Sequence, residues 1–232
     1  MEKLLMKVKL ISHTIACAND LENVATPTDL IAYCARVSNP SNQYNMETAD
    51  KLISYLIKWK HWSPFEMVNA TLEIETTRDI ARQILRHRSF TFQEFSQRYA
   101  DPVKELEFVT REARLQDQKN RQNSIETGDT QLQEMWDKMQ WDLIEKAKGV
   151  YNWAISQGIA KEVARAVLPE GLTTSRMYVN GTLRSWIHYI DIRSDKATQK
   201  EHRMIALECA KAISEIFPLI NNFSHYESDN AK

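Results

Sequence analysis

The chain has 232 residues, of which 43% are hydrophobic and 26% are charged, as in a single globular domain with a sizeable core. Its formal net charge of −1 argues against broad electrostatic attraction to nucleic acid, which needs a strongly basic face. No apolar run approaches the roughly 18 residues of a membrane-spanning helix. The three scattered cysteines form no disulfide framework, so we expect a cytoplasmic protein.

Periodicity predicts alternating strands and helices in the first half of the chain. Thr26 suits the N-cap and Pro27 the first position of a helix, which Asn39-Pro40 would end. Between residues 67 and 75 apolar side chains share one face and polar side chains the other, as in a half-buried strand. The expected elements are a strand over 5–14, helices over 28–37 and 49–60, a strand over 67–75 and a helix over 77–88.

The stretch from Arg86 to Arg98 reads RHRSFTFQEFSQR and combines cations, aromatic rings, a carboxylate, hydroxyls and amides. On a helical projection Arg88 falls on the apolar side, so either the helix ends near His87 or a guanidinium group is partly buried. The hydroxyl and amide side chains that follow compete for backbone partners. We therefore expect residues 90–98 to form a loop that lines a pocket.

The second half of the chain is richer in helices. A polar stretch predicts a solvated insertion around residues 110–130, as a loop or a frayed helix. A long amphipathic helix ended by Gly158 follows, and we interpret its Met and Trp stripe as core. Helices are expected over 132–154, 161–169, 182–193 and 199–216, with an extended segment over 173–181. The predicted fold class is α/β (α+β), a single domain over 1–232 with a mixed sheet, long helices and a helix-rich second half.

Five segments resemble the motifs of the flavin-dependent thymidylate synthases. The first is RHR followed by seven residues and Ser96, within RHRSFTFQEFSQR. The others follow in the expected order, and together they span most of the chain: CARVS at 34–38, HWSPFE at 61–66, ARAVLP at 164–169 and LRSWIHYIDIR at 183–193. The family signature commonly reads RHRxxSxNExSxR, so this chain departs from it at Thr91, Gln93 and Gln97.

The resemblance implies the fold of that family and its chemistry. A one-carbon unit moves from methylenetetrahydrofolate to the uracil ring of dUMP, and FAD reduced by NADPH supplies hydride. No enzyme nucleophile is needed, and none of the three cysteines lies in a motif that suggests one. The resemblance further implies a homotetramer whose subunits share each site. From the apolar runs and the net charge we expect no membrane and no nucleic-acid partner.

The resemblance also assigns roles position by position. Guanidinium groups suit these anionic ligands because arginine meets phosphate with two parallel donors. Arg193 matches the arginine near the pyrimidine edge, where a cation would make C5 of the uracil more nucleophilic. The positions that match dUMP-binding residues are Gln83, Arg86, Glu94, Phe95, Ser96, Gln97, Arg98, Arg165 and Arg193. The positions that match FAD-binding residues are Ser63, Arg86, His87, Arg88, Glu94, Arg184 and His188.

Other interpretations of the same residues stay open at this point. The histidines lack HxxxH or HExxH spacing, so we expect no metal. Arg165 and Arg193 could form structural ion pairs with Glu162, Asp191 or Asp195. A single-stranded nucleic-acid-binding module would use the phenylalanines between the arginines for base stacking. A flavoprotein of the same fold that has lost methyl transfer is a third alternative.

Overall fold

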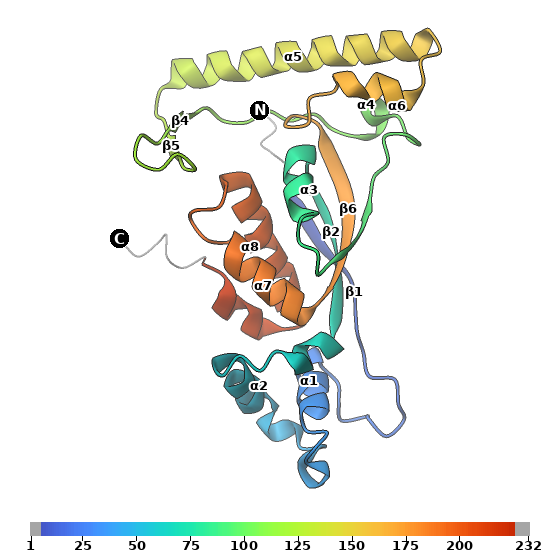
Figure 1. The fold of residues 1–232 in the computed structure, drawn as a ribbon, viewed down its shortest axis with the longest axis vertical. Helices are drawn as coiled ribbons and strands as arrows, with labels where there is room; N and C mark the ends of the chain where they lie inside the picture. The colour runs from blue at the N-terminus through green and yellow to red at the C-terminus, as the bar shows by residue number, and fades with distance from the viewer. Residues whose placement is uncertain (1–5, 226–232) are drawn as a thin grey trace.

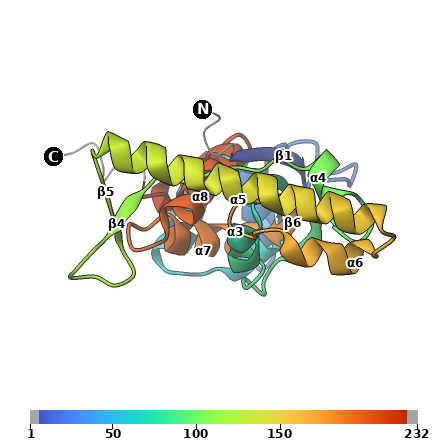
Figure 2. The same cartoon turned by 90° about the horizontal axis from the view of Figure 1, so that it is seen from above.

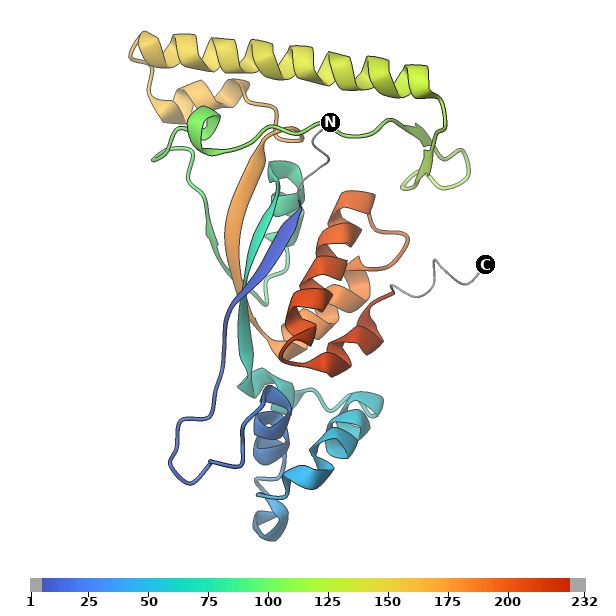
Figure 3. The same cartoon turned by 180° about the vertical axis from the view of Figure 1, so that it is seen from behind.

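A four-stranded sheet forms the centre of the molecule in the computed structural model, which describes residues 6–225 (Figure 3). The strands are β1 (Lys7–His13), β2 (Asn69–Thr77), β6 (Thr174–Thr182) and β3 (Thr91–Glu94), hydrogen-bonded in the order β1-β2-β6-β3. The α/β class is confirmed, but every strand pair of this sheet within residues 6–225 is antiparallel, so the predicted mixed sheet is wrong. The alternation of buried and half-buried residues along β2 suits an antiparallel sheet with one covered face.

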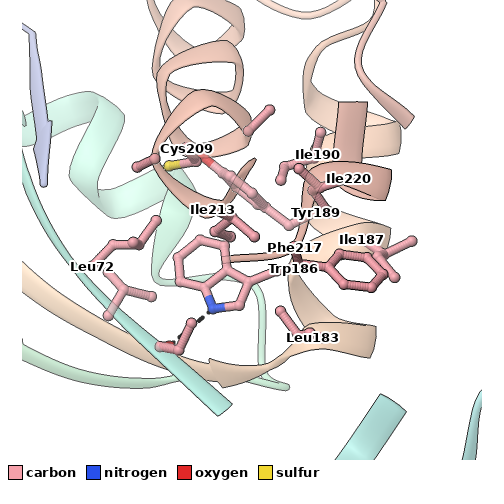
Figure 4. Close-up of a cluster of buried hydrophobic side chains, with 14 of the residues drawn as sticks. Leu72, Leu183, Trp186, Ile187, Tyr189, Ile190, Cys209, Ile213, Phe217 and Ile220 are labelled. Carbon is pink, nitrogen blue, oxygen red and sulfur yellow. Dashed lines mark hydrogen bonds between the residues drawn. The ribbon is translucent and has the colours of Figure 1, made fainter. Parts of the chain in front are cut away.

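Two helices, α7 (Leu183–Arg193) and α8 (Lys200–Ser214), cover one face of this sheet (Figure 1). Figure 4 shows the core between the helices and the sheet, which is built around the fully buried ring of Trp186. Its Nε1–H donates to the carbonyl oxygen of Ala70 on β2 at 3.0 Å, so the indole loses no hydrogen bond on burial. This core fixes α7 against the sheet, and the site described below depends on that contact.

The N-terminal helices α1 (Pro27–Ala35) and α2 (Ala49–Lys58) lie beyond one end of the sheet (Figure 1). The predicted N-cap of α1 is confirmed. Thr26 Oγ1 accepts from the N–H of Asp29 at 3.1 Å, and Asp29 Oδ2 accepts from the N–H of Thr26 at 3.0 Å. Two short 3₁₀ turns, η1 (Pro40–Asn42) and η2 (Met46–Thr48), connect α1 to α2, and a third, η3 (Ser63–Met67), connects α2 to β2.

The longest helix, α5 (Thr130–Ser156), crosses the opposite end of the molecule and is about 40 Å long (Figure 2). Its apolar residues were predicted as core, but one complete row of them is exposed. We call this row the outer stripe; its spacing alternates between three and four residues, with Lys146 as the one polar position, and its apolar members are Leu132, Trp136, Met139, Leu143, Val150 and Trp153. The core prediction is therefore wrong for this row within the single chain.

The first half of α5 is seated on its own chain through amide groups. Gln140 Oε1 accepts from the N–H of Arg111, and its Nε2 donates to the carbonyl of the same residue, both at 2.9 Å. Gln133 makes the same pair of bonds with Ala113 at 2.8 Å. Residues 111–113, which precede the 114–126 hairpin, have no neighbouring strand in the described structure. The two glutamines provide the hydrogen-bond partners that their backbone groups need.

The remaining elements are short. The loop predicted over residues 90–98 contains β3, because pairing with β6 gives the backbone from Thr91 to Glu94 the partners that its side chains were expected to supply. The predicted insertion contains an exposed two-stranded hairpin. None of the helices among residues 6–225 is long and apolar enough to cross a membrane. The other elements are α3 (Arg78–Ile84), α4 (Pro102–Glu105), β4 (Arg114–Gln116), β5 (Ser124–Glu126), α6 (Lys161–Ala164), η4 (Arg165–Val167) and η5 (Pro218–Phe223).

Candidate functional site

The RHR segment lies in a tight turn that joins α3 to β3. The helix ends at Ile84, and the N–H groups of Arg86 and His87 donate back to the carbonyls of Gln83 (3.3 Å) and Ile84 (3.0 Å). The helix thus ends before His87, and Arg88 is exposed. Of the two alternatives that the sequence left open, the early helix end is confirmed, and the two arginines of the turn are both available to a ligand.

Phe90 anchors this turn in the core. Its ring centroid lies 4.5 Å from that of Trp186 and 5.8 Å from that of Tyr189. The ring also lies directly over Gly181, where a Cβ atom would overlap it. Because the N–H of Phe90 donates to the carbonyl of His87 at 3.2 Å, the packing of this one ring sets the position of the histidine.

His87 contacts Arg193, which is the last residue of α7. The Nε of Arg193 donates to His87 Nε2 at 2.9 Å, so that ring nitrogen carries a lone pair and Nδ1 carries the proton. Burial, together with the smaller effects of the charges of Arg193, His188 and Arg86, lowers the pKa of His87 to about 4, so the imidazole is neutral at pH 7. Among residues 6–225 neither terminal nitrogen of Arg193 has a hydrogen-bond partner, so both are available as donors to a planar acceptor.

A second cluster surrounds Glu94 at the other end of α3. Ser175 Oγ donates to Glu94 Oε1 at 2.8 Å, and Arg78 Nη1 lies 3.6 Å from the same oxygen. Burial lowers the pKa of Arg78, and the nearby charges of Arg82 and Arg165 lower it further, against the raising effect of Glu94. The structure thus brings Glu94 and Arg165 together around a buried arginine.

Arg98 lines a cavity of about 500 Å³ together with Tyr99 and the start of α6. The guanidinium group pairs with Glu162 at 3.2 Å, and Lys161 Nζ donates to the carbonyl of Tyr99 at 2.8 Å. The Tyr99 side chain is 88% exposed. An exposed aromatic ring beside two cations gives this cavity the chemistry to hold a flat anionic ligand.

Ser63 and Arg184 lie at the opposite end of α7 from Arg193. Ser63 is exposed at the start of η3, whose Glu66 accepts from Arg184 Nη1 at 2.5 Å and from Thr182 Oγ1 at 2.8 Å. The hydrogen bond from Arg184 lowers the pKa of Glu66, so that carboxyl stays ionised at neutral pH. Arg184 is nine positions before Arg193 on this 11-residue helix, a distance of roughly 14 Å along its axis.

The other predicted residues differ in accessibility. Ser96 and His188 are exposed, whereas Phe95 is half-buried. The Gln97 side chain is 3% exposed, and its Nε2 has no hydrogen-bond partner among the residues that the structure describes. One chain therefore brings together Gln83, Arg86, His87, His188 and Arg193 as one group, and Glu94 and Arg165 as another, with Arg98, Ser63 and Arg184 at separate places.

The charges of the site fit anionic ligands. Within the described part of the chain, four of the predicted arginines have no acidic oxygen within 4.0 Å, namely Arg86, Arg88, Arg165 and Arg193. The structural ion pairs considered for Arg165 and Arg193 are not formed; Glu162 pairs with Arg98 instead. Phosphate groups of a nucleotide or of FAD would supply the missing negative charge. No three His, Cys, Asp or Glu side chains of residues 6–225 gather as a metal site would require.

Comparison with known proteins decides the family. Residues 20–219 match the family model described as thymidylate synthase complementing protein. The chain belongs to the flavin-dependent thymidylate synthase family. It is 48% identical over 215 residues to the probable flavin-dependent thymidylate synthase of Paramecium bursaria Chlorella virus 1, which covers 93% of this chain and 97% of that one. It is 51% identical over 195 residues to the Synechocystis enzyme, covering 84% of this chain and 88% of its relative.

Solved structures agree on the fold of this flavin-dependent thymidylate synthase family member. A UMP/dUMP methylase, PolB from Streptomyces cacaoi bound with 5-Br dUMP, superimposes with a TM-score of 0.77 over 95% of each chain. Its complex with 5-Br UMP gives 0.78 over 95% of this chain and 94% of that one. The sequence identities are 23% and 24%, so these matches speak for the fold alone. The family assignment confirms the predicted enzyme class and its flavin, FAD.

Sequence reasoning missed three side chains next to the predicted ones. Arg78 lies against Glu94, and both Gln199 and His202 contact Gln83. A signal for His202 exists in the sequence, because the apolar row of α8 at 205, 209 and 213 runs back to position 202 in helical steps. A histidine on an apolar helix face is buried and needs a partner, and here the partner is a predicted ligand-binding residue.

Proposed function

We propose that this family member converts dUMP to dTMP, with methylenetetrahydrofolate as the one-carbon donor and FAD, reduced by NADPH, as the hydride carrier. The observation that carries this proposal is the 2.9 Å contact between Arg193 Nε and the neutral His87. This contact holds the guanidinium group of Arg193 near Arg86, and among the described residues that group has no acidic partner. Relatives named for this activity at 48% and 51% identity support the assignment.

Arg193 has the catalytic role in this proposal. With Nε engaged by His87, the side chain presents its two terminal nitrogens to the edge of the pyrimidine. A fixed cation there stabilises negative charge on the uracil ring and so raises electron density at C5, the carbon that accepts the one-carbon unit. Since His87 is neutral, it orients Arg193 and adds no second positive charge.

The remaining nucleotide contacts fall to residues that keep donors or lone pairs for a ligand. Gln83 can meet the pyrimidine edge through its amide, and Arg86 and Arg165 can bind the phosphate because neither is paired with an acid among the described residues. The segment from Glu94 to Arg98 completes the proposed dUMP site. Arg98 would have to exchange Glu162 for the ligand, which is feasible because both partners are largely exposed.

FAD would be held by exposed polar and cationic side chains. The unpaired arginines of the RHR turn fit its pyrophosphate. When bound, the reduced flavin supplies the hydride that completes the methyl group. The proposed FAD-binding residues are Ser63, Arg86, His87, Arg88, Glu94, Arg184 and His188.

The assembly we propose is a homotetramer with shared active sites. The predicted residues lie at several separate places in one chain, so a complete site needs more than one subunit. The outer stripe of α5 offers the surface for such an assembly, because its alternation of three and four residues is the spacing with which helices pack side by side. A second copy of the same helix would bury it.

The cysteines support a mechanism without an enzyme thiolate. Burial raises the pKa of Cys209 well above its ordinary value and raises that of Cys34 to a smaller extent. Neither is therefore poised as a nucleophile at neutral pH. A cytoplasmic location remains a proposal that rests on the scattered, unpaired cysteines.

The first test is the visible absorption spectrum of the purified protein after incubation with FAD and removal of the excess. We expect the two bands of bound oxidised flavin, altered when dUMP is added. A protein that retains no flavin but binds oligonucleotides with strong salt dependence would support the nucleic-acid-binding alternative. Oxidation of NADPH without conversion of dUMP to dTMP would indicate a flavoprotein that has lost methyl transfer.

The second test removes the proposed catalytic cation. Arg193→Ala should abolish dTMP formation while most of the FAD stays bound, because the other flavin contacts are intact. Arg121→Ala on the exposed hairpin removes the same charge away from the site and should leave turnover unchanged. Turnover by Arg193→Ala at the wild-type rate would remove this residue from the mechanism.

A further inference from the structure

Four side chains from α3 and from the N-cap and first turn of α8 form a line of hydrogen bonds in which Gln83 lies between Gln199 and His202. Gln83 Nε2 donates to Gln199 Oε1 at 2.9 Å, and Gln83 Oε1 lies 3.1 Å from His202 Nδ1. Gln199 Nε2 in turn donates to Glu201 Oε2 at 2.9 Å. Both atoms of the Gln83 amide are therefore engaged from one side, while the residue itself stays half-buried rather than fully enclosed.

The direction of every bond in this line follows from Glu201. The residue Glu201 is 3% exposed, and its carboxylate pairs with Arg114 Nη2 at 2.6 Å. Hydrogen bonds from Gln199 and Arg114 contribute to lowering its pKa against the effect of burial, so Glu201 only accepts. Gln199 must then turn its amide nitrogen to Glu201 and its oxygen to Gln83.

The same logic fixes Gln83 and His202. Because Gln199 presents an oxygen, Gln83 must present Nε2 to it, which leaves Gln83 Oε1 facing the histidine. An oxygen there needs a donor, so the proton of the neutral His202 ring sits on Nδ1. The reversed Gln83 amide would set oxygen against oxygen on one side and N–H against N–H on the other.

His202 has no other polar contact that explains its burial. The residue is 0% exposed on the apolar face of α8, and its Nε2 has no hydrogen-bond partner among the residues that the structure describes. Burial, together with smaller contributions from Arg193 and His87, lowers the pKa of the ring to about 3 and so keeps it neutral. A leucine would fill such a position at lower cost, so the retained hydrogen bond to Gln83 is its one visible polar use.

We propose that His202 is a positioning residue for substrate recognition, which holds the Gln83 amide, through its Nδ1–H, in the orientation that Glu201 and Gln199 set. The inference rests on the proposed function, in which Gln83 contacts the pyrimidine of dUMP. The held amide has one N–H and one lone pair left, and the edge of a uracil ring offers a carbonyl oxygen beside an N–H group. Only one orientation of the amide matches that pattern in a given pose, so the residue that fixes it strengthens binding without touching the ligand.

The test compares dUMP affinity in His202→Leu and His202→Asn, measured by calorimetry on the FAD-loaded protein. The leucine variant lacks the donor, whereas Asn Nδ2 occupies the position of His Nδ1 and keeps it. We expect the dissociation constant for dUMP to rise about tenfold in His202→Leu, the size of one ordinary hydrogen bond, and to return close to wild type in His202→Asn. Equal affinities of the leucine variant and the wild type would overturn the proposal, and equal losses in both variants would reduce His202 to a packing residue.

A double-mutant cycle with Gln83→Ala separates this proposal from the one it rests on. If Gln83→Ala leaves dUMP affinity unchanged, the assigned role of Gln83 fails. If Gln83→Ala weakens binding and His202→Leu weakens it further by the same factor in that background, Gln83 keeps its role and the positioning proposal fails. We expect no further loss in the double variant, because the histidine acts only through the glutamine. FAD affinity should be unchanged throughout, and His13→Leu serves as the matched control.

A direct measurement does not depend on the substrate. The ¹⁵N chemical shifts of the His202 ring distinguish a proton on Nδ1 from one on Nε2, and we expect Nδ1–H between pH 6 and 8. A proton found on Nε2 would remove the donor to Gln83 and overturn the proposal, whatever the binding data show.

Discussion

The helices α8 and α5 carry similar apolar periodicity but are buried in different ways. The apolar row of α8 packs on the sheet and is fully covered by its own chain, as Ile205, Cys209 and Ile213 show. The outer stripe of α5 is open, and the first half of that helix is instead fastened to residues 111–113 by glutamine amides. An apolar row thus shows that a helix face is to be covered, but it does not show whether the same chain covers it.

The largest expected effect lies in the α7–α8 region. Trp186→Ala should lower the free energy of unfolding by about 3–5 kcal/mol, because it leaves a cavity in a closed core and strips the Ala70 carbonyl of its donor. Trp141→Ala on α5, where the side chain is 38% exposed and off the outer stripe, is the matched control. Urea unfolding followed by circular dichroism measures both. If both variants lost a similar free energy of unfolding, the α7–α8 core and α5 would not differ in stability as we expect.

Acid should weaken the α7–α8 side selectively, because His87 and His202 both lie there with lowered pKa values of about 4 and about 3. The folded state keeps both rings neutral, and the unfolded chain takes up protons below about pH 6.5. Stability is therefore complete above that pH and is lost as the pH falls. At pH 5 the loss should be about 2 kcal/mol for His202 and less for the half-buried His87.

Urea titrations from pH 8 to pH 5 at constant chain concentration test this slope of the free energy of unfolding against pH. His202→Asn should flatten it, because one of the two buried rings that resist protonation is gone. A free energy of unfolding that stays constant between pH 7 and pH 5 would contradict the neutral, buried state of both histidines.

The amide fastening of α5 predicts an intermediate effect. Gln140→Ala should cost about 1–3 kcal/mol, since the N–H and carbonyl of Arg111 lose their partners next to a buried helix face. Gln131→Ala, on an exposed position of the same helix, should change the free energy of unfolding by less than about 0.5 kcal/mol. Thermal unfolding of the two variants side by side measures the difference. A Gln140→Ala variant as stable as Gln131→Ala would mean that apolar contacts alone seat the helix.

The smallest effect on the single chain, and the sharpest on assembly, is expected for the outer stripe. Met139 is 61% exposed, so Met139→Glu should barely change the fold of one chain. In a tetramer built on this stripe it would bury a charge without a partner, and the assembly should dissociate. Light scattering after size exclusion gives the mass. Lys138→Glu, at an exposed position about 100° around α5 from Met139 and outside the stripe, should keep the tetramer, and an unchanged mass for Met139→Glu would exclude the stripe as an interface.

Local pattern alone predicted most of the elements and part of the site. The capping pair at Thr26, the strand at 69–77 and the helices of the second half follow from side-chain spacing, which is a short-range property. The chemistry of the RHR turn followed from residue type and from the family resemblance. The roles of the individual site residues stay predictions, although the structure places His87 against Arg193 and leaves four arginines without acidic partners in its described part.

What the sequence by itself determined is which segments form helices or strands and which face of each is apolar. The tertiary structure alone decided that β3 pairs with β6, that all strands are antiparallel and that the outer stripe stays open. It also decided that Gln83 meets Gln199 and His202, which are 116 and 119 positions away in the chain. The physical reason is the range of the interactions. Periodicity is a local property and indicates that a segment needs burial or a hydrogen-bond partner, whereas contacts between distant segments determine which partner it has.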